Sequence, residues 1–427
     1  MSISSKIIFG IAIIAASMLQ ISCSGNSDKK TVITFWAMGA EGESVQKLLP
    51  QFEKENPGIR VKVQMIPWTA AQEKLITAYA SDNMPDVWQL GNTWIPQFSA
   101  LNALEDLNTW TAKSSTVKKD NYFEGIWNTN VMNGQVYGIP WYVDTRVMFY
   151  RKDVFSRAGY DRPPKSWAEL YDLSRRIRKN AGGGEKYAIY LPTNEWAPFV
   201  IFALQNGSTL LRNNDSYGNF SAPEFKEAFR YAVRFLQEGL APIGISQVTN
   251  VYQAFAEEYF SIYISGPWNV VEFRKWMKNG LKDKWAIAPL PSVDGRNPGL
   301  SLAGGASLVM SRKSEHKKEA WKFIEYLSRP DVQLRFYNLL YDLPAVKIAW
   351  QDPSLLHDEY MSKFYEQLQY VTPTPKIPEW EQIAFAKIQQ YAELAARNSM
   401  SIDQAAAALD KDVNQILEKR RWLLSRK

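Results

Sequence analysis

The chain has 427 residues, of which 46% are hydrophobic and 22% charged, and its formal net charge is +6. These values are typical of a globular protein large enough for two domains, and the interleaved acidic and basic residues argue against a nucleic-acid-binding surface. A single cysteine excludes internal disulfides, and no apolar stretch after the first 22 residues is long enough to span a bilayer.

The N-terminus has the features of a secretory signal peptide: a charged start at Lys6, an apolar run over residues 7–18 and a small residue before Cys23. Cys23 resembles the lipidation site of bacterial lipoproteins, although Gln20 stands where such sites usually have Leu. We therefore expect residues 1–22 to be removed, and Cys23 to carry a lipid that anchors the protein to a membrane. Residues 23–30 would then form a tether. The alternative is cleavage nearby with Cys23 unmodified.

The first part of the chain alternates between strand and helix patterns. Strands are predicted at 32–36, 59–65 and 86–90, and helices at 43–55 and 72–80. This order predicts an α/β fold with a mostly parallel sheet and helices on its faces. Ligands of such sheets bind at the carboxyl ends of strands, which here are residues 36–41 and 89–94.

A second unit is predicted after residue 140. Ser166 and Glu169 form a capping-box pattern at the start of a helix that runs to residue 178. Residues 289–298 are rich in Pro and Gly and are predicted to cross between the two units. Further strands are expected at 145–150, 186–191 and 260–264, and further helices from residue 224, over 315–340 and over most of the C-terminal part.

Several kinds of chemistry have no support in the sequence. The histidines, His316 and His357, lie in charged segments, which argues against a Ser-His-Asp triad or a histidine-rich metal site. No phosphate-binding or dinucleotide-binding glycine pattern occurs, so we expect neither a metal nor a cofactor. Glycoside hydrolysis stays open because it needs only two carboxylates. Its candidate residues are Glu41, Glu43, Asp86, Asp144, Glu257 and Glu258.

An ordered series of short motifs resembles the bacterial extracellular solute-binding proteins for sugars, the capture subunits of ABC importers. The resemblance covers nearly the whole chain after the signal peptide. One departure is the segment 257–262, where family members often have a Gly-Lys-Ala-Ala-Met-type strand. The motifs are Phe35-Trp36-Ala37-Met38-Gly39, Phe52 to Ile59, Pro85-Asp86-Val87, Gly134 to Pro140, Phe149 to Asp153, Ala158-Gly159, Pro163 to Trp167, Ser265-Gly266-Pro267-Trp268, Gly304-Gly305 and Leu343-Pro344-Ala345.

The resemblance implies a periplasmic-binding-protein fold of type II, with two α/β lobes joined by crossover segments and a ligand cleft between them. The first lobe would comprise residues 31–142 and 300–342, and the second residues 143–299 and 343–427. It further implies a monomeric, exported receptor without catalytic activity. Such a receptor would capture a mono- or oligosaccharide and deliver it to ABC-transporter permease subunits. A secreted glycosidase or lyase, or a receptor for a peptide, polyamine or phosphate ester, is the alternative.

The 16 Trp and 21 Tyr residues suit a sugar ligand, because aromatic rings cover the apolar face of a pyranose while polar side chains bind its hydroxyls. Gly304 and Gly305 are expected to let the backbone approach the ligand. Trp36, Tyr341 and Trp380 have core packing as their main alternative. By position in the matched motifs, the candidate ligand-binding residues are Trp36, Glu41, Asn92, Trp94, Tyr142, Asp144, Trp196, Trp268, Gly304, Gly305, Tyr341 and Trp380.

Overall fold

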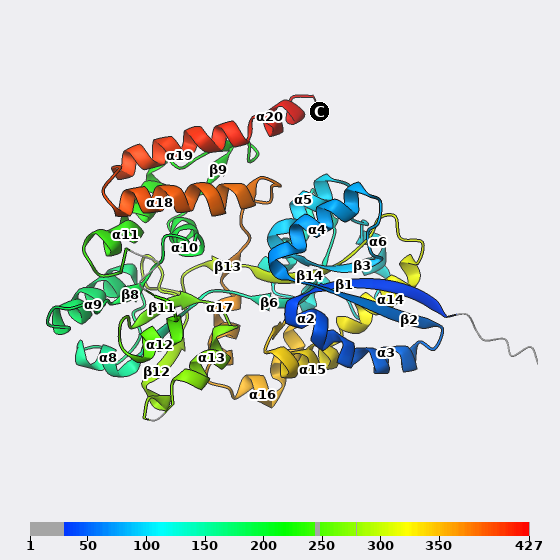
Figure 1. Ribbon diagram of the computed structural model, residues 1–427, viewed down its shortest axis with the longest axis horizontal. Coiled ribbons are helices and arrows are strands. Elements are labelled where there is room, and N and C mark those ends of the chain that lie inside the picture. The colour runs from blue at the N-terminus through cyan, green and yellow to red at the C-terminus, as the bar shows by residue number, and fades with distance from the viewer. Residues whose placement is uncertain (1–29, 244–247, 279, 427) are drawn as a thin grey trace, which may run out of the picture.

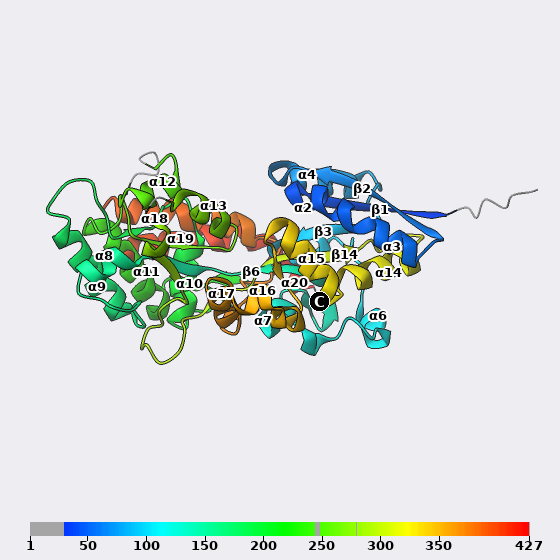
Figure 2. The same cartoon turned by 90° about the horizontal axis from the view of Figure 1, so that it is seen from below.

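The computed structural model describes residues 30–243, 248–278 and 280–426. The predicted signal peptide, Cys23 and nearly all of the predicted tether lie outside the described residues. Figure 1 shows two α/β lobes side by side. Figure 2 shows the same two lobes seen from below, with β6 (Ile139–Asp144) passing between them. Each lobe is built on its own sheet.

The larger sheet has the strand order β15-β6-β14-β3-β1-β2 and defines the first lobe. β1 is parallel to both β2 and β3, as the alternating strand and helix pattern predicts. β14 enters antiparallel between β3 and β6, because it returns from the second lobe and approaches the sheet from the opposite end. The bounds not yet given are β1 (Thr31–Met38), β2 (Ile59–Ile66), β3 (Val87–Gly91), β14 (Gly304–Met310) and β15 (Leu343–Pro344).

The helices of the first lobe cover both faces of this sheet (Figure 1). The helix predicted at 43–55 begins earlier and is divided into α2, a 3-10 turn η1 and α3. The bounds are α2 (Gly39–Ser44), η1 (Val45–Leu48), α3 (Leu49–Glu55), α4 (Trp68–Ala80), η2 (Asn92–Trp94), α5 (Ile95–Ala100), α6 (Asn108–Lys113), η3 (Lys119–Asn121), α7 (Glu124–Asn128), α14 (Lys317–Leu327) and α15 (Pro330–Leu340), with the hairpin β4 (Val131–Met132) and β5 (Gln135–Val136).

The second lobe is built on the smaller sheet, with the order β12-β7-β11-β8. The strand predicted at 186–191 is reduced to β8 (Ile189–Tyr190). The other bounds are β7 (Val147–Arg151), β11 (Ile262–Ser265), β12 (Trp285–Ala288), α8 (Lys152–Arg157), α9 (Trp167–Asn180), α10 (Ala197–Gln205), β9 (Leu211–Arg212), β10 (Tyr217–Gly218), α11 (Pro223–Gln237), α12 (Val251–Ala256), α13 (Asn269–Trp276), η5 (Lys282–Lys284), the π-helix η7 (Gln382–Ile388), α18 (Gln389–Ala396), α19 (Ile402–Ile416) and α20 (Glu418–Leu424).

Half of the predicted capping box forms at the start of α9. Ser166 Oγ accepts a hydrogen bond from the backbone N–H of Glu169 at 3.2 Å. The Glu169 carboxylate does not return to Ser166; it accepts from the backbone N–H of Lys165 at 2.8 Å and pairs with Arg162. The helix therefore starts where the pattern predicts. The second contact of the capping box, from Ser166 N–H to the Glu169 carboxylate, is replaced by contacts of that carboxylate with Lys165 N–H and Arg162.

The segments that join the lobes are linked to one another by hydrogen bonds. β13 (Ser301–Leu302) pairs in parallel with β16 (Val371–Thr372). Ser301 Oγ donates to the Arg146 carbonyl at 2.8 Å and accepts from the Arg146 N–H at 3.1 Å. The remaining elements, η6 (Lys347–Gln351), α16 (Pro353–Leu356) and α17 (Met361–Leu368), lie between β15 and β16 in the chain. β15 pairs with β6 in the first-lobe sheet, whereas the sequence analysis assigned residues from 343 onward to the second lobe.

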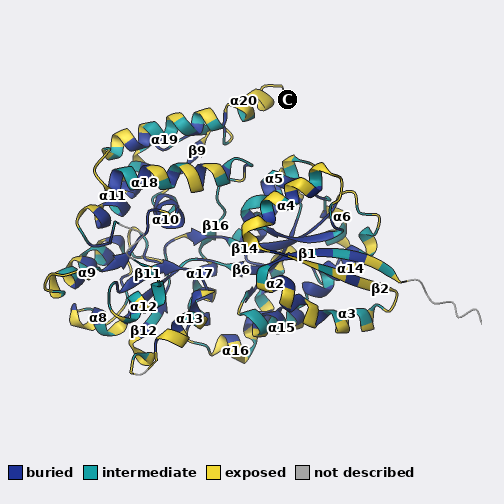
Figure 3. Cartoon of the chain, viewed as in Figure 1, coloured by how far each residue is buried: buried dark blue, intermediate teal, exposed yellow. Residues whose placement is uncertain are grey.

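The central strands of both sheets are buried, whereas the edge strand β2 and the outer faces of the helices are partly exposed (Figure 3). Apolar clusters fill the faces of both sheets, and the second-lobe cluster includes Trp380, which is 0% exposed. Among the described residues, no helix is both long enough and apolar enough to cross a membrane.

Candidate ligand-binding cleft

A cavity of about 380 Å³ lies between the lobes and receives side chains from both. Its volume falls in the range of small-molecule sites, roughly 300–1,000 Å³. Of the predicted site residues, Glu41, Asn92, Trp94, Tyr142, Asp144, Trp196, Trp268, Gly304 and Gly305 line it. The structure thus brings together residues that lie up to 264 positions apart in the chain (Glu41 to Gly305).

Glu41 is positioned at the carboxyl end of β1, where Gly39 takes a φ of +46° and turns the chain into α2. Its carboxylate accepts hydrogen bonds from Tyr142 Oη at 2.8 Å, Trp68 Nε1 at 3.3 Å and Gln89 Nε2 at 3.4 Å. Burial and the neighbouring Glu41 raise the pKa of Tyr142 well above its usual value, so the phenol stays protonated and donates. Glu41 is therefore held in a fixed orientation on the cavity wall.

Asp144 ends β6 and pairs with the Arg146 guanidinium at 2.9 Å. Burial raises the pKa of Asp144, and Arg146 opposes this shift. Tyr142 and Asp144 both lie on β6 within the first-lobe sheet, whereas the predicted lobe boundary placed residues from 143 onward in the second lobe. Arg146 and the Gly305 backbone both donate hydrogen bonds to this carboxyl group, and a carboxylate has lone pairs left over with which it can accept from a ligand hydroxyl.

Gly304 and Gly305 lie on β14 directly opposite the end of β6. A Cβ at Gly304 would lie 2.1 Å from Asp144 Oδ1, and a Cβ at Gly305 would lie 2.3 Å from the Tyr142 carbonyl oxygen. Gly305 also has a φ of +115°, which a residue with a side chain rarely adopts. Both glycines line the cavity, and their missing side chains give room to β6 and the Asp144 carboxyl group.

Two polar groups in the cavity have atoms without a hydrogen-bond partner among the described residues: Asn92 Nδ2 and Asp342 Oδ2. Asn92 is held in place by its oxygen, which accepts from Ser307 Oγ at 3.0 Å. Burial, together with the charges of Glu41 and Asp144, raises the pKa of Asp342 well above its usual value. Buried polar atoms normally have partners, so these two atoms mark positions on the cavity wall where a polar ligand would find an unpaired donor and an unpaired carboxyl oxygen once the side chains move to expose them.

Aromatic rings form the walls. On the first lobe Trp68 and Trp94 pack edge to face, with ring centroids 5.9 Å apart. On the second lobe Trp196 packs against Phe385 at 5.8 Å. Trp268 is 50% exposed, and its ring lies so close to Gly266 that a Cβ there would come within 2.0 Å of a ring carbon. The cavity is therefore bordered by flat apolar surfaces on both lobes.

Three predicted residues do not line the cavity. Trp36 packs beside the first-lobe core, with Lys74 Nζ 5.3 Å from its ring centre. Tyr341 caps the end of α15 with a φ of +64° and packs against Tyr337. Trp380 is fully buried behind Trp196, 5.9 Å away. The alternative prediction for all three was core packing. Trp36 and Trp380 do pack in the core, whereas Tyr341 lies on the surface and is 39% exposed.

The cavity is also lined by residues that were not predicted from the sequence, and those with a charged or aromatic side chain are Trp68, Arg146, Asp342, Glu381 and Phe385. Trp68 follows the carboxyl end of β2, and ligands of parallel sheets bind at such strand ends, so Trp68 could have been predicted from the sequence. Glu381 has a pKa raised by burial, against which hydrogen bonds from Thr93 and Trp94 act. Nothing local in the sequence separates Glu381 or Phe385 from other residues of the C-terminal helices.

The other carboxylates considered for hydrolysis lie away from the cavity. Asp86 accepts from Thr34 N–H and Thr34 Oγ1, both at 2.8 Å, and from Ser314 Oγ at 2.6 Å, so both of its oxygens are hydrogen-bonded within the structure. Glu258 pairs with Arg151 and Arg157. Within the part of the chain that the structure describes, no cluster of His, Cys, Asp and Glu is placed to hold a metal ion.

A family match and similar solved structures both relate this chain to solute-binding proteins. Residues 37–334 match the family described as bacterial extracellular solute-binding protein. The structure of the sugar-binding protein MalE from the phytopathogen Xanthomonas citri is similar to this chain at 45% identity, with a TM-score of 0.90, and the match covers 93% of this chain and 100% of that one. A Thermotoga lettingae ABC-transporter solute-binding protein bound with alpha-D-tagatose is 25% identical, with a TM-score of 0.74 and coverage of 91% and 100%.

A curated relative gives a third comparison. The galactooligosaccharide-binding protein of Bacillus subtilis is 26% identical over 411 residues, which cover 93% of each chain. The two lobes and the crossing segments between them are therefore those of the maltose-binding type of fold, as the motif series predicts.

Proposed function

The chain belongs to the bacterial extracellular solute-binding protein family, and from this premise we propose that it is an exported carbohydrate receptor of an ABC importer. It binds a neutral mono- or oligosaccharide in the cavity between its lobes and delivers it to permease subunits. The receptor is monomeric, has no catalytic activity and uses no cofactor. Its relatives at 45% and 26% identity are named for sugar or oligosaccharide binding, which supports this ligand class.

The observation that carries the proposal is the combination of half-exposed indole surface and unpartnered polar atoms in one cavity. A pyranose has an apolar C–H face, which Trp268 and Trp94 can cover, and a rim of hydroxyls. Asn92 Nδ2 supplies a donor and Asp342 a carboxyl group at this rim, while Glu41 and Asp144 have oxygens that accept hydroxyl protons. This arrangement satisfies both faces of a sugar at once.

The excess of carboxyl groups over basic groups in the cavity favours a neutral ligand over an anionic one. Glu41, Asp144, Asp342 and Glu381 face a single cation, Arg146, among the described lining residues. A phosphate ester or an acidic peptide would meet these carboxyl groups and lose its own hydration without adequate compensation. The same excess of carboxyl groups makes a cationic solute such as a polyamine the second candidate.

Titration with maltose, maltotetraose, diacetylchitobiose, galactobiose, spermidine and glucose 6-phosphate tests the proposal. Tryptophan fluorescence gives Kd, and the melting temperature gives an independent measure of binding. A true ligand at 100-fold excess over Kd adds about 2.7 kcal/mol of stability. Response to a neutral sugar alone supports the receptor. Response to spermidine alone supports the second candidate, and no response to any sugar refutes the first.

The absence of catalysis and the attachment to a membrane need their own measurements. Chromatography of each bound sugar after long incubation should recover it unchanged, whereas shorter products would identify a hydrolase or lyase. We further propose that a lipid on Cys23 and the tether 23–30 keep the receptor near its permease. Size-exclusion chromatography with light scattering checks the monomeric state.

A further inference from the structure

A chain of hydrogen bonds leads from behind the cavity to the turn that carries Trp268. Trp268 precedes the first residue of α13, in the short turn that leaves the end of β11. Its own side chain is half exposed, so packing around the ring holds it only in part. The orientation of the indole therefore depends on the backbone of this turn as well as on the Arg146 guanidinium, which lies 4.6 Å from the ring centre.

Asn269 closes the turn with its side-chain amide. Its Nδ2 donates to Ser265 Oγ at 2.7 Å and to the Gly266 carbonyl at 3.1 Å. Its Oδ1 accepts from Tyr252 Oη at 3.1 Å. Asn269 is 3% exposed, so water cannot replace these bonds at low cost. The Gly266 carbonyl can only accept, which directs the amide nitrogen toward it, and the Tyr252 hydroxyl then holds the amide oxygen.

Tyr252 lies on α12, and hydrogen bonds at both ends of this helix hold it in place. At the first end, Asn250 Oδ1 accepts from the N–H groups of Tyr252 and Gln253, each at 3.0 Å. At the last end, Arg151 Nη1 donates to the carbonyls of Phe255 and Ala256, each at 3.0 Å. A helix of six residues has little stability of its own, so these end contacts decide its position.

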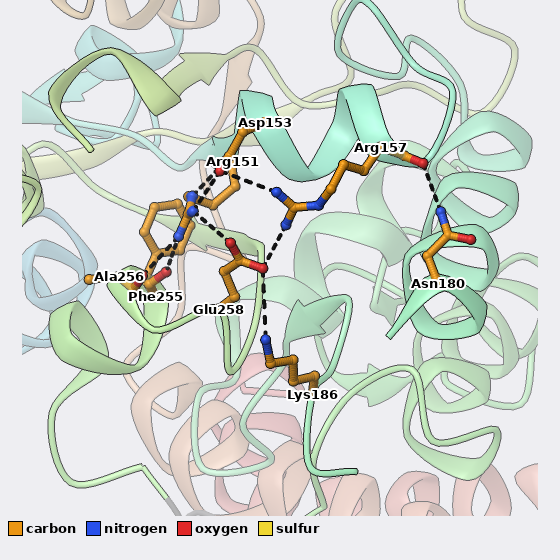
Figure 4. A network of polar contacts seen from close by, with 8 residues as sticks. All are labelled: Arg151, Asp153, Arg157, Asn180, Lys186, Phe255, Ala256 and Glu258. Carbon is orange, nitrogen blue, oxygen red and sulfur yellow. Dashed lines mark hydrogen bonds and ion pairs between the residues drawn. The ribbon is translucent and has the colours of Figure 1, made fainter. Parts of the chain in front are cut away.

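Arg151 is itself anchored on all sides, as Figure 4 shows. Its Nε and Nη2 each bind Asp153 at 2.8 Å, and Nη2 also binds Glu258 at 3.0 Å. The guanidinium is 1% exposed and uses every donor it has, which makes it a rigid bracket between β7 and α12. Removing Arg151 would leave the carbonyls of Phe255 and Ala256 without this donor and would disturb β7 and α12 together, so Arg151 itself is a poor test position.

We propose that Tyr252, acting through Asn269, is a positioning residue that sets the Trp268 ring for ligand binding. The proposal rests on the carbohydrate-receptor function for its effect on affinity, but its effect on the ring needs no ligand. Tyr252 does not line the cavity, so any influence on binding has to pass through the turn. The ring of Tyr252 packs edge to face on Phe273, 5.3 Å away, and a phenylalanine keeps that contact.

The test compares Tyr252→Phe with a matched control, Tyr231→Phe. Tyr231 is also partly buried in the second lobe and donates to the Trp167 carbonyl at 2.9 Å, but it has no contact with the turn. Tryptophans are replaced by 5-fluorotryptophan, and Trp268→Ala identifies the Trp268 signal in the fluorine NMR spectrum. Tyr252→Phe should shift or broaden that signal, while Tyr231→Phe leaves it unchanged. An unaltered Trp268 signal in Tyr252→Phe overturns the proposal.

Affinity for maltose, or for whichever neutral sugar of the panel binds more tightly, supplies the second measurement. Tyr252→Phe should weaken binding about 3- to 10-fold, the effect of one hydrogen bond. In the Trp268→Ala background the same change should have no further effect, because its route to the ligand is gone. Equal weakening in both backgrounds contradicts the proposal. Failure of the wild-type protein to bind any sugar refutes the receptor function and leaves the NMR test intact.

Discussion

Replacement of Trp268 by alanine is the most direct test of the cavity. A tryptophan presents about 150–250 Å² of surface, and half of Trp268 is exposed, so about 100 Å² is open to a ligand. At about 25 cal/mol per Å², coverage by a sugar ring contributes about 2.5 kcal/mol, or roughly 60-fold in Kd. Trp268→Ala should lose that factor. Its stability should fall by only about 1–3 kcal/mol, because half of the ring already faces solvent.

Isothermal titration calorimetry with a sugar that binds the wild-type protein measures the loss, and thermal unfolding shows that the variant is folded. Trp276→Ala is the matched control: Trp276 is the last residue of α13, the helix that Trp268 precedes, and is 37% exposed, but it does not line the cavity. The control should bind with wild-type affinity. Unchanged affinity in Trp268→Ala, or an equal loss in Trp276→Ala, would show that the indole at 268 is not part of the binding surface.

Three further changes test other parts of the structure. Asp342 binds its proton more tightly in the folded than in the unfolded state, so stability is lost as the pH rises above the unfolded pKa of about 4. Asp342→Asn should therefore raise the melting temperature at pH 7–8, with a gain that shrinks toward pH 4; a pH-independent effect contradicts this. Gly304→Ala places a Cβ against the Asp144 carboxylate, which should cost about 1–3 kcal/mol in urea unfolding and weaken sugar binding; wild-type values for both would refute the steric argument. Cys23→Ala should abolish labelling with a radioactive fatty acid, and persistent labelling would place the lipid elsewhere.

Local signals identified the residues at strand ends. Glu41 follows β1, Asn92 and Trp94 follow β3, and Trp268 follows β11, and all four line the cavity. Strand and turn patterns depend on neighbouring residues, so the sequence carries them. The carboxyl ends of adjacent parallel strands meet at one edge of a sheet, and this geometric rule converts local patterns into a shared site.

Burial of aromatic side chains could not be predicted in the same way. Trp380 and Phe385 lie five positions apart at the start of the C-terminal helices, yet Trp380 is 0% exposed and Phe385 is 54% exposed and lines the cavity. The π-helical turn η7 changes the angle between successive side chains, which a regular helical period does not describe. Tyr341 and Asp342 show the same difficulty, since a left-handed residue ends α15 and directs Asp342 into the cavity.

By itself the sequence determined the α/β class, the order of the first strands and the residues that end them, because these follow from hydrogen bonding and side-chain periodicity among near neighbours. Only the tertiary structure decided which helical faces meet across the cleft and how β14 and β15 join the first sheet. It also shows that position 304 has no room for a side chain beside Asp144. Those features arise where segments more than 150 residues apart pack together, as Ser301 does against Arg146. Contacts of this kind depend on the shape of both partners, which no local pattern contains.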